Sequence, residues 1–161
     1  MAINFGDSSV QTFSSKIIQV KRALRATQIT TSSSSYSDIT SLDFTPKSSS
    51  SVIHCEFTGN AYVEEEPGGV RVRFYDNDDS DRFGTSLHAS ESGPLIWRFD
   101  FHGGHTGNIY SYGGIIWRTQ ESSWGTSSKN IKVQLAQGGN GTVGFISEYL
   151  PCTFTITEVM E

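Results

Sequence analysis

Apolar and polar residues alternate with a period of two along most of the chain after residue 15. The clearest case is the segment 70–75, in which Val70, Val72 and Phe74 alternate with Arg71, Arg73 and Tyr75. Successive side chains of a β-strand point to opposite faces, so this period predicts a strand with one apolar and one polar face. The same pattern predicts strands over residues 16–26, 37–44, 51–63, 94–102, 109–118, 131–136, 141–147 and 152–159.

Glycine and proline separate several of these segments. Pro67-Gly68-Gly69 stands between residues 61–63 and 70–75. It predicts a tight turn closing a hairpin, because glycine tolerates the positive φ of such turns. Gly113-Gly114 predicts a bulge or turn inside residues 109–118. Roughly nine or ten strands without a helical period predict an all-β protein, an antiparallel β-sandwich or jelly roll. At 161 residues the chain is one domain long, and we place that domain at residues 16–161.

Hydroxyl side chains are unusually frequent, with 24 serines and 15 threonines, whereas only 18% of residues are charged. This composition favours strands joined by many turns over a helical bundle. The formal net charge is −5, and the densest basic stretch, residues 16–25, spreads its cations over both faces of a predicted strand. We interpret that stretch as solvated surface and expect no nucleic-acid partner. No apolar run approaches the roughly 18 residues of a membrane span, so we expect no membrane insertion.

Residues 1–15 are polar and lack a clear period. Ile3, Phe5, Val10 and Phe13 are isolated apolar points in this segment. We interpret it as an N-terminal arm that is not part of the core. The segment lacks both a basic start and an apolar stretch, so we expect no signal peptide.

Cys55 and Cys152 are far apart in the sequence, and each stands among alternating apolar residues. This placement favours two buried thiols over a disulfide. Zinc would need ligands at close spacing, and the sequence holds no C-x-x-C pair.

Two loops carry candidate metal ligands. The acidic stretch 76–81 contains Asp76, Asp78 and Asp81, whose carboxylates are the oxygen ligands that calcium prefers. It does not fit the helix-loop pattern, since Asp81 stands where that pattern needs glycine, and a solvated loop is the alternative. His102 and His105 flank two glycines, but two histidines without a third ligand equally fit an ordinary loop.

Neither catalysis nor cofactor binding has a recognisable motif here. The sequence contains no G-x-S-x-G, H-E-x-x-H, G-x-x-x-x-G-K-[ST] or G-x-G-x-x-G, and we expect the protein not to be an enzyme. Trp124 lies in a polar loop and, with Tyr110 and Tyr112, could stack on the apolar face of a sugar ring. Contact with a glycan and contact with a protein partner are both open for Trp124.

One stretch of the sequence carries a resemblance to a known family. Ile17-Ile-Gln-Val-Lys is followed by a Thr/Ser run, then by Tyr36-Ser-Asp-Ile-Thr-Ser-Leu-Asp-Phe-Thr-Pro, a serine tract and an apolar strand. Residues 16–57 resemble, in this order, a domain of tail-fibre and related virion proteins of tailed phages, especially phages of marine cyanobacteria. The closing Thr153-Phe-Thr-Ile-Thr-Glu-Val is similar to the last strand of that domain, whereas residues 64–128 depart from it.

The resemblance implies a β-sandwich that assembles as a homotrimer on a virion, with no catalytic residues to carry over. The face formed by Arg71, Arg73 and Tyr75 is then a plausible subunit contact, because Arg and Tyr are enriched at interfaces. We expect a short tail-fibre or spike subunit, made in the host cytoplasm, that joins other virion proteins through its arm. A capsid decoration protein and a free-standing carbohydrate-binding lectin are the alternatives.

Overall fold

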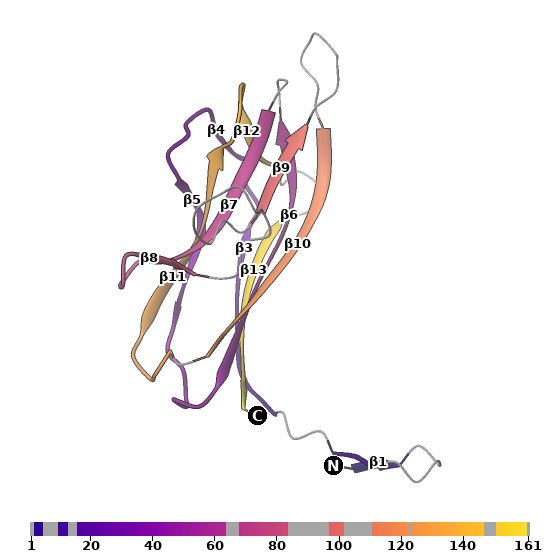
Figure 1. Cartoon of the computed structure of the whole chain (residues 1–161), viewed down its shortest axis with the longest axis vertical. Helices are drawn as coiled ribbons and strands as arrows, with labels where there is room; N and C mark the ends of the chain where they lie inside the picture. The colour runs from indigo at the N-terminus through magenta and orange to yellow at the C-terminus, as the bar shows by residue number, and fades with distance from the viewer. Residues whose placement is uncertain are drawn as a thin grey trace.

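A computed structural model describes residues 2–4, 10–12, 16–63, 68–83, 97–101, 111–122, 124–146 and 151–160 (Figure 1). These residues contain strands and connecting segments, and no helix is found among them. The strands are β1 (Ala2–Asn4), β2 (Val10–Thr12), β3 (Lys16–Arg25), β4 (Ile29–Thr31), β5 (Ser37–Phe44), β6 (Val52–Val63), β7 (Gly68–Asp76), β8 (Asp81–Phe83), β9 (Trp97–Phe101), β10 (Ser111–Ser122), β11 (Lys129–Gln137), β12 (Val143–Ile146) and β13 (Cys152–Met160).

The strands after the N-terminal pair β1–β2 are paired in a nested order. β3 and β4 pair with β13 and β12, β5 pairs with β11, β6 with β10, and β7 with β8 and β9. Every one of these pairs is antiparallel, so together they form one long hairpin. The strand pairs of this hairpin are divided between two sheets, which is the topology of a jelly roll. The predicted all-β sandwich is confirmed, and of the two forms predicted it is the jelly roll.

Each sheet has a long central strand. In the first sheet β6 pairs with β10 along one edge, and with β13 and then β12 along the other. In the second sheet β7 pairs with β11 along one edge, and with β8 and β9 along the other. β3 and β4 complete the first sheet, and β5 completes the second.

The core lies between the two sheets. Strands β5, β6, β7, β11, β12 and β13 all contribute fully buried side chains to one cluster. The rings of Phe74 and Phe154, from opposite sheets, have centroids 5.3 Å apart. The predicted faces of β6 and β7 are confirmed, since Cys55, Phe57 and Val72 belong to this cluster. Both cysteines are buried and free, as predicted.

Two predictions about glycine-containing segments were wrong. β6 and β7 do not form a hairpin, because they belong to different sheets and both edges of β7 are taken by other strands. Each strand has an apolar face that it buries against the opposite sheet instead. Gly113 and Gly114 make no bulge, because β10 keeps a continuous register with β6 through both of them, opposite Ala61 and Asn60.

Strand β3 directs three of its polar side chains toward the second sheet. They donate hydrogen bonds to backbone carbonyls in and beside β5: Gln19 to Thr45 O (2.7 Å), Lys21 to Asp43 O (2.7 Å) and Arg25 to Ile39 O (2.8 Å). The predicted alternation in β3 is therefore present, and the apolar Val20 and Leu24 face solvent, at 55% and 57% exposure. Polar residues close this margin of the sandwich, and apolar residues face outward.

Candidate functional site

The outer face of the second sheet carries a polar network around Arg73. Arg73 Nε donates to Gln134 Oε1 at 2.8 Å, and Gln134 Nε2 donates to Asp38 Oδ1 at 2.6 Å. The guanidinium carbon of Arg73 lies 3.9 Å from the ring centroid of Tyr36 and 4.8 Å from that of Tyr75. Two of the three residues predicted as a subunit contact therefore make contacts within their own chain.

The carboxylate of Asp38 is the acidic centre of this network. Its side chain remains 48% exposed, and Lys132 Nζ lies 2.9 Å from Asp38 Oδ2. Burial by itself would raise the pKa of Asp38, but Gln134, Lys132 and Arg73 hold it below its ordinary value. Arg71, the third predicted contact residue, packs beside Gly138, where an added Cβ would lie 3.2 Å from its side chain. This face can accept a polar partner, and its role as a subunit contact stays a prediction.

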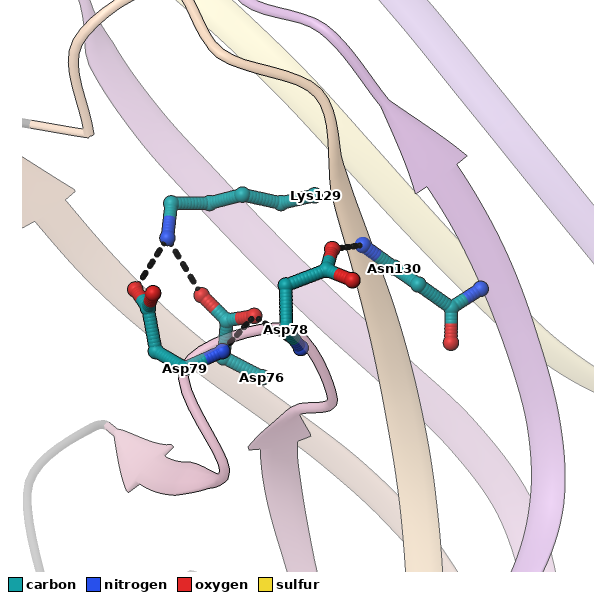
Figure 2. A network of polar contacts seen from close by, with 5 residues as sticks. All are labelled: Asp76, Asp78, Asp79, Lys129 and Asn130. Atoms are coloured by element: carbon teal, nitrogen blue, oxygen red, sulfur yellow. Dashed lines mark hydrogen bonds and ion pairs between the residues drawn. The ribbon is translucent and has the colours of Figure 1, made fainter.

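The acidic stretch predicted as a calcium site forms a different structure (Figure 2). The ammonium of Lys129, at the start of β11, lies 2.5 Å from both Asp76 Oδ2 and Asp79 Oδ2. Asp78 Oδ2 accepts the backbone N–H of Asn130 at 2.6 Å. Burial alone would lower the pKa of Lys129, but the two carboxylates raise it above its ordinary value. The same lysine lowers the pKa of Asp79.

This arrangement ties the loop after β7 to β11. Asp76 also accepts the backbone N–H groups of Asp78 and Asp79 through Oδ1, at 3.1 and 3.4 Å, so both of its oxygens have protein partners. The side chain of Asp81 lies outside the described residues. Within the described part of the chain, no three His, Cys, Asp or Glu residues form a metal-ligand group. His102 and His105 are outside that part, and both metal hypotheses stay predictions.

Trp124 is half-buried beside this ion network. Its ring meets Phe44 of the core edge-on, with centroids 6.5 Å apart and planes at 72°. Lys129 Nζ lies 5.9 Å from its centroid. Tyr110 lies outside the described residues, and Tyr112 is placed only by its backbone, opposite Tyr62. The glycan-binding role of these three residues therefore stays a prediction.

The outer face of the first sheet is lined by short polar side chains. His54, Glu56, Thr155 and Thr157 border an open hollow of about 220 Å³ between β6 and β13. Arg22 of β3 donates to Thr153 Oγ1 at 3.3 Å. This face is rich in hydroxyl groups and is bordered by the exposed apolar residues of β3.

The sequence interpretation missed Glu158, a fully buried carboxylate in β13. Its oxygens accept hydrogen bonds from Ser51 Oγ (2.7 Å), Lys47 N (2.8 Å), Ser48 N (3.1 Å) and Gln19 Nε2 (2.6 Å). Burial would raise the pKa of Glu158, but these four hydrogen bonds hold it below its ordinary value. Position 158 has the same parity as the buried residues Phe154 and Ile156, and that parity was the available signal.

The predicted anchoring residues fall in or beside a short hairpin. Ile3 in β1 pairs with Gln11 in β2, and Asn4 pairs with Val10. Phe5 and Phe13 lie outside the described residues. The anchoring role of residues 1–15 stays a prediction.

Comparisons with known proteins give little direct guidance. No protein-family model and no curated protein matches the sequence. The fold is similar to solved structures of VP2 of infectious bursal disease virus: a mutant in T=1 particles (TM-score 0.44, 10% identity), a subviral particle (0.41, 12%) and the Gx strain (0.42, 12%). The matches cover 99% of this chain and 43–44% of those chains, so this chain spans less than half of their length. At these TM-scores the likeness does not establish a common fold. No helix in the described residues is long and apolar enough to cross a membrane.

Proposed function

We propose that the chain is a structural subunit of a virion, and specifically a short tail-fibre or spike subunit of a tailed phage. The observation that carries this proposal is the jelly-roll topology combined with the sequence of residues 16–57. Jelly rolls recur in viral capsid and lectin domains. The segment that resembles phage virion proteins forms β3, β4, β5 and the first half of β6, which belong to both sheets.

The surface supports a structural role. Threonines 153, 155 and 157 of β13 are partly exposed and lie between β3 and β6, so the first sheet presents hydroxyl groups where charges are common in other proteins. Such a face is hydrated without strong repulsion between copies, and it suits side-by-side packing. The proposal includes a homotrimer and the N-terminal arm as the attachment to other virion proteins. It assigns no catalysis to the chain.

The experiment is to locate the chain on particles. Antibodies against the purified chain should label virions of the phage that encodes it, at a fixed site and copy number. A chain lacking residues 1–15 should fold and self-associate but fail to incorporate. Labelling confined to free protein would contradict the proposal, and incorporation of the shortened chain at normal copy number would contradict the role of the arm.

The same experiment separates the tail-fibre role from capsid decoration, which is the first alternative. Label at the tail tip or baseplate supports a fibre or spike that contacts the host surface. Label distributed over the head supports a decoration protein.

A carbohydrate-binding lectin is the second alternative, favoured by the position of Trp124. Its half-buried indole stands beside Lys129 and the acidic loop, where stacking and polar contacts with a sugar could combine. A glycan array should then show binding that Trp124→Ala abolishes and Trp124→Phe partly retains, because phenylalanine keeps a ring that can stack. Thermal unfolding of both variants checks that they fold, since Trp124 also packs on the core. An array without signal contradicts the lectin alternative.

A further inference from the structure

The exposed large hydrophobic residues of the described chain are concentrated at one margin of the sandwich. They are Ile17 (62% exposed), Val20 (55%), Leu24 (57%) and Met160 (40%). The first three lie on β3, and Met160 pairs with Lys16 at the start of that strand. Single exposed apolar residues are ordinary on a protein surface, but a contiguous group marks a site of interaction.

A β-bulge brings the three β3 residues onto one side of the sheet. Thr157 pairs with Val20 and Glu158 pairs with Gln19, but Val159 then pairs with Ile17, so Ile18 has no partner in β13. In a regular strand Ile17 would share the inward side with Gln19. The bulge returns it to the outward side, which is the use that bulges commonly have in sheets. Ile17, Val20 and Leu24 therefore form one line, which we call the outer stripe.

The strand that carries the outer stripe is also an edge. β3 pairs with β13 on one side, and no other described strand pairs with it. The backbone groups on the other side of this ten-residue strand face no described strand, and such an edge is a template for contact with another chain unless the protein covers it. An open edge and an apolar outer face thus occur on the same strand.

The charge of β3 indicates what kind of partner fits it. The strand holds Lys16, Lys21, Arg22 and Arg25 and no acidic residue. The rest of the chain keeps eight of the twelve basic residues and all seventeen acidic ones, a formal charge of −9. Two β3 edges joined about a two-fold axis would bring like charges together, which is unfavourable. An acidic surface of another copy is complementary.

We infer that β3 is a subunit interface, in which the outer stripe and the basic residues of one copy contact an acidic surface of a second copy. The contact is heterologous, because the two copies contribute different surfaces, and such contacts close into rings when the rotation allows it. The proposed homotrimer would be one such ring. The inference deepens the proposed function and rests on it only in requiring self-association.

The test is the association of the full chain measured by light scattering behind a sizing column over a range of concentrations. The wild-type chain should have a mass that is a multiple of 17.7 kDa, and its association should weaken as salt is raised. Val20→Thr with Leu24→Thr keeps residues that favour strands while removing apolar contact area, and it should weaken association about 30-fold or more. Arg22→Glu should have an equal or larger effect, because it places a negative charge between the two altered positions.

Tyr75→Ser tests the competing contact face on the second sheet, and it should leave the association constant unchanged if β3 is the interface. Thr30→Ala is the matched control, because Thr30 is exposed on β4 at the opposite edge of the first sheet. Thermal unfolding of diluted samples checks that each variant folds, and two independent β3 variants guard against misfolding of either one.

Three results would overturn the inference: a wild-type chain that stays monomeric at the highest soluble concentration, β3 variants that associate as the wild type does, or dissociation caused by Tyr75→Ser alone. A monomer that still labels virions would leave the virion role standing, whereas this inference and the proposed homotrimer would both fail. Association through β3 in a chain that is absent from virions would support this inference and contradict the proposed virion role.

Discussion

Glu158 offers the sharpest test of how the first sheet is held to its neighbours. Its side chain is fully buried, and the four groups that donate to it are neutral. Glu158→Gln keeps the shape of the side chain but replaces one acceptor oxygen with an amide donor. Gln19 cannot adapt by rotating its own amide, because Nε2 also donates to Thr45 O at 2.7 Å. The substitution therefore creates a contact between two donors.

The magnitude follows from the number and kind of hydrogen bonds. Bonds to a charged group contribute about 1.5–3 kcal/mol each, and neutral ones about 0.5–1.5 kcal/mol. The variant loses the bond from Gln19 and weakens the other three, but it no longer buries a charge. We expect the free energy of unfolding to fall by about 2 kcal/mol at neutral pH. For a chain of this length that corresponds to a Tm lower by roughly 4–8 °C.

The stabilising effect of Glu158 on the folded state should depend on pH in a definite direction. The folded-state pKa of Glu158 is lowered, so its stabilising effect is complete above the pKa of unfolded glutamate, about 4.3, and is lost as the pH falls through the folded value. The difference in unfolding free energy between wild type and Glu158→Gln should be constant near neutrality and shrink in acid. The other carboxylates titrate alike in both proteins, so their contributions cancel in this difference.

Urea unfolding followed by tryptophan fluorescence, at a series of pH values, measures that difference. Lys47→Ala is the matched control, because Lys47 donates to Glu158 through its backbone N–H, and the change should stay within about 0.5 kcal/mol. A Glu158→Gln variant as stable as wild type at neutral pH would refute the reasoning. So would a loss of stability that persists undiminished in strong acid.

Three further predictions concern an ion pair, a close contact and the thiols. Lys129→Met should lower the free energy of unfolding in urea by about 2 kcal/mol, because it leaves two aspartates without their cation. Lys132 is more exposed, and Lys132→Met should lower it by less than about 1 kcal/mol. Gly59→Ala should lower the unfolding free energy by about 1–3 kcal/mol, since the new Cβ would lie 3.0 Å from a thiol and a phenyl ring; an unchanged Tm would contradict this. Burial raises the pKa of Cys152 to about 11, and Cys55 is equally buried, so neither thiol should react with a disulfide reagent near about pH 8 until urea unfolds the chain.

The alternation of residues predicted the strands well because it is a local property. The strand from Cys152 was found from its period of two, and the same parity places Glu158 among buried positions. What the pattern could not supply was the partner groups, since Gln19, Lys47 and Ser51 are more than 100 residues away in the sequence. The charged Glu158 at a position of apolar parity was the visible signal in the sequence. The groups that stabilise its carboxylate come from distant parts of the chain.

The wrong hairpin prediction has the same origin. A glycine-rich segment between two apolar strands predicts a hairpin when only its neighbours are considered, but β6 and β7 each find their edge partners elsewhere in the chain. The acidic loop is a candidate calcium site, beside a solvated loop, because its carboxylates are adjacent in sequence, and that hypothesis stays a prediction. Lys129, which lies between Asp76 and Asp79, comes from a strand about fifty residues later. The candidate metal site could be located from sequence, but its counter-ion could not.

The inverted orientation of β3 connects the fold to the proposed assembly. In an isolated sandwich, an edge strand with apolar and polar faces would gain most by burying the apolar face. β3 instead uses Gln19, Lys21 and Arg25 to bind carbonyls at the edge of the other sheet. These long side chains bridge the gap between the edges of the two sheets. The same orientation of β3 leaves Val20 and Leu24 exposed to solvent. Burial of the outer stripe requires a second surface, and in the assembly that we propose a neighbouring copy of the chain would supply it.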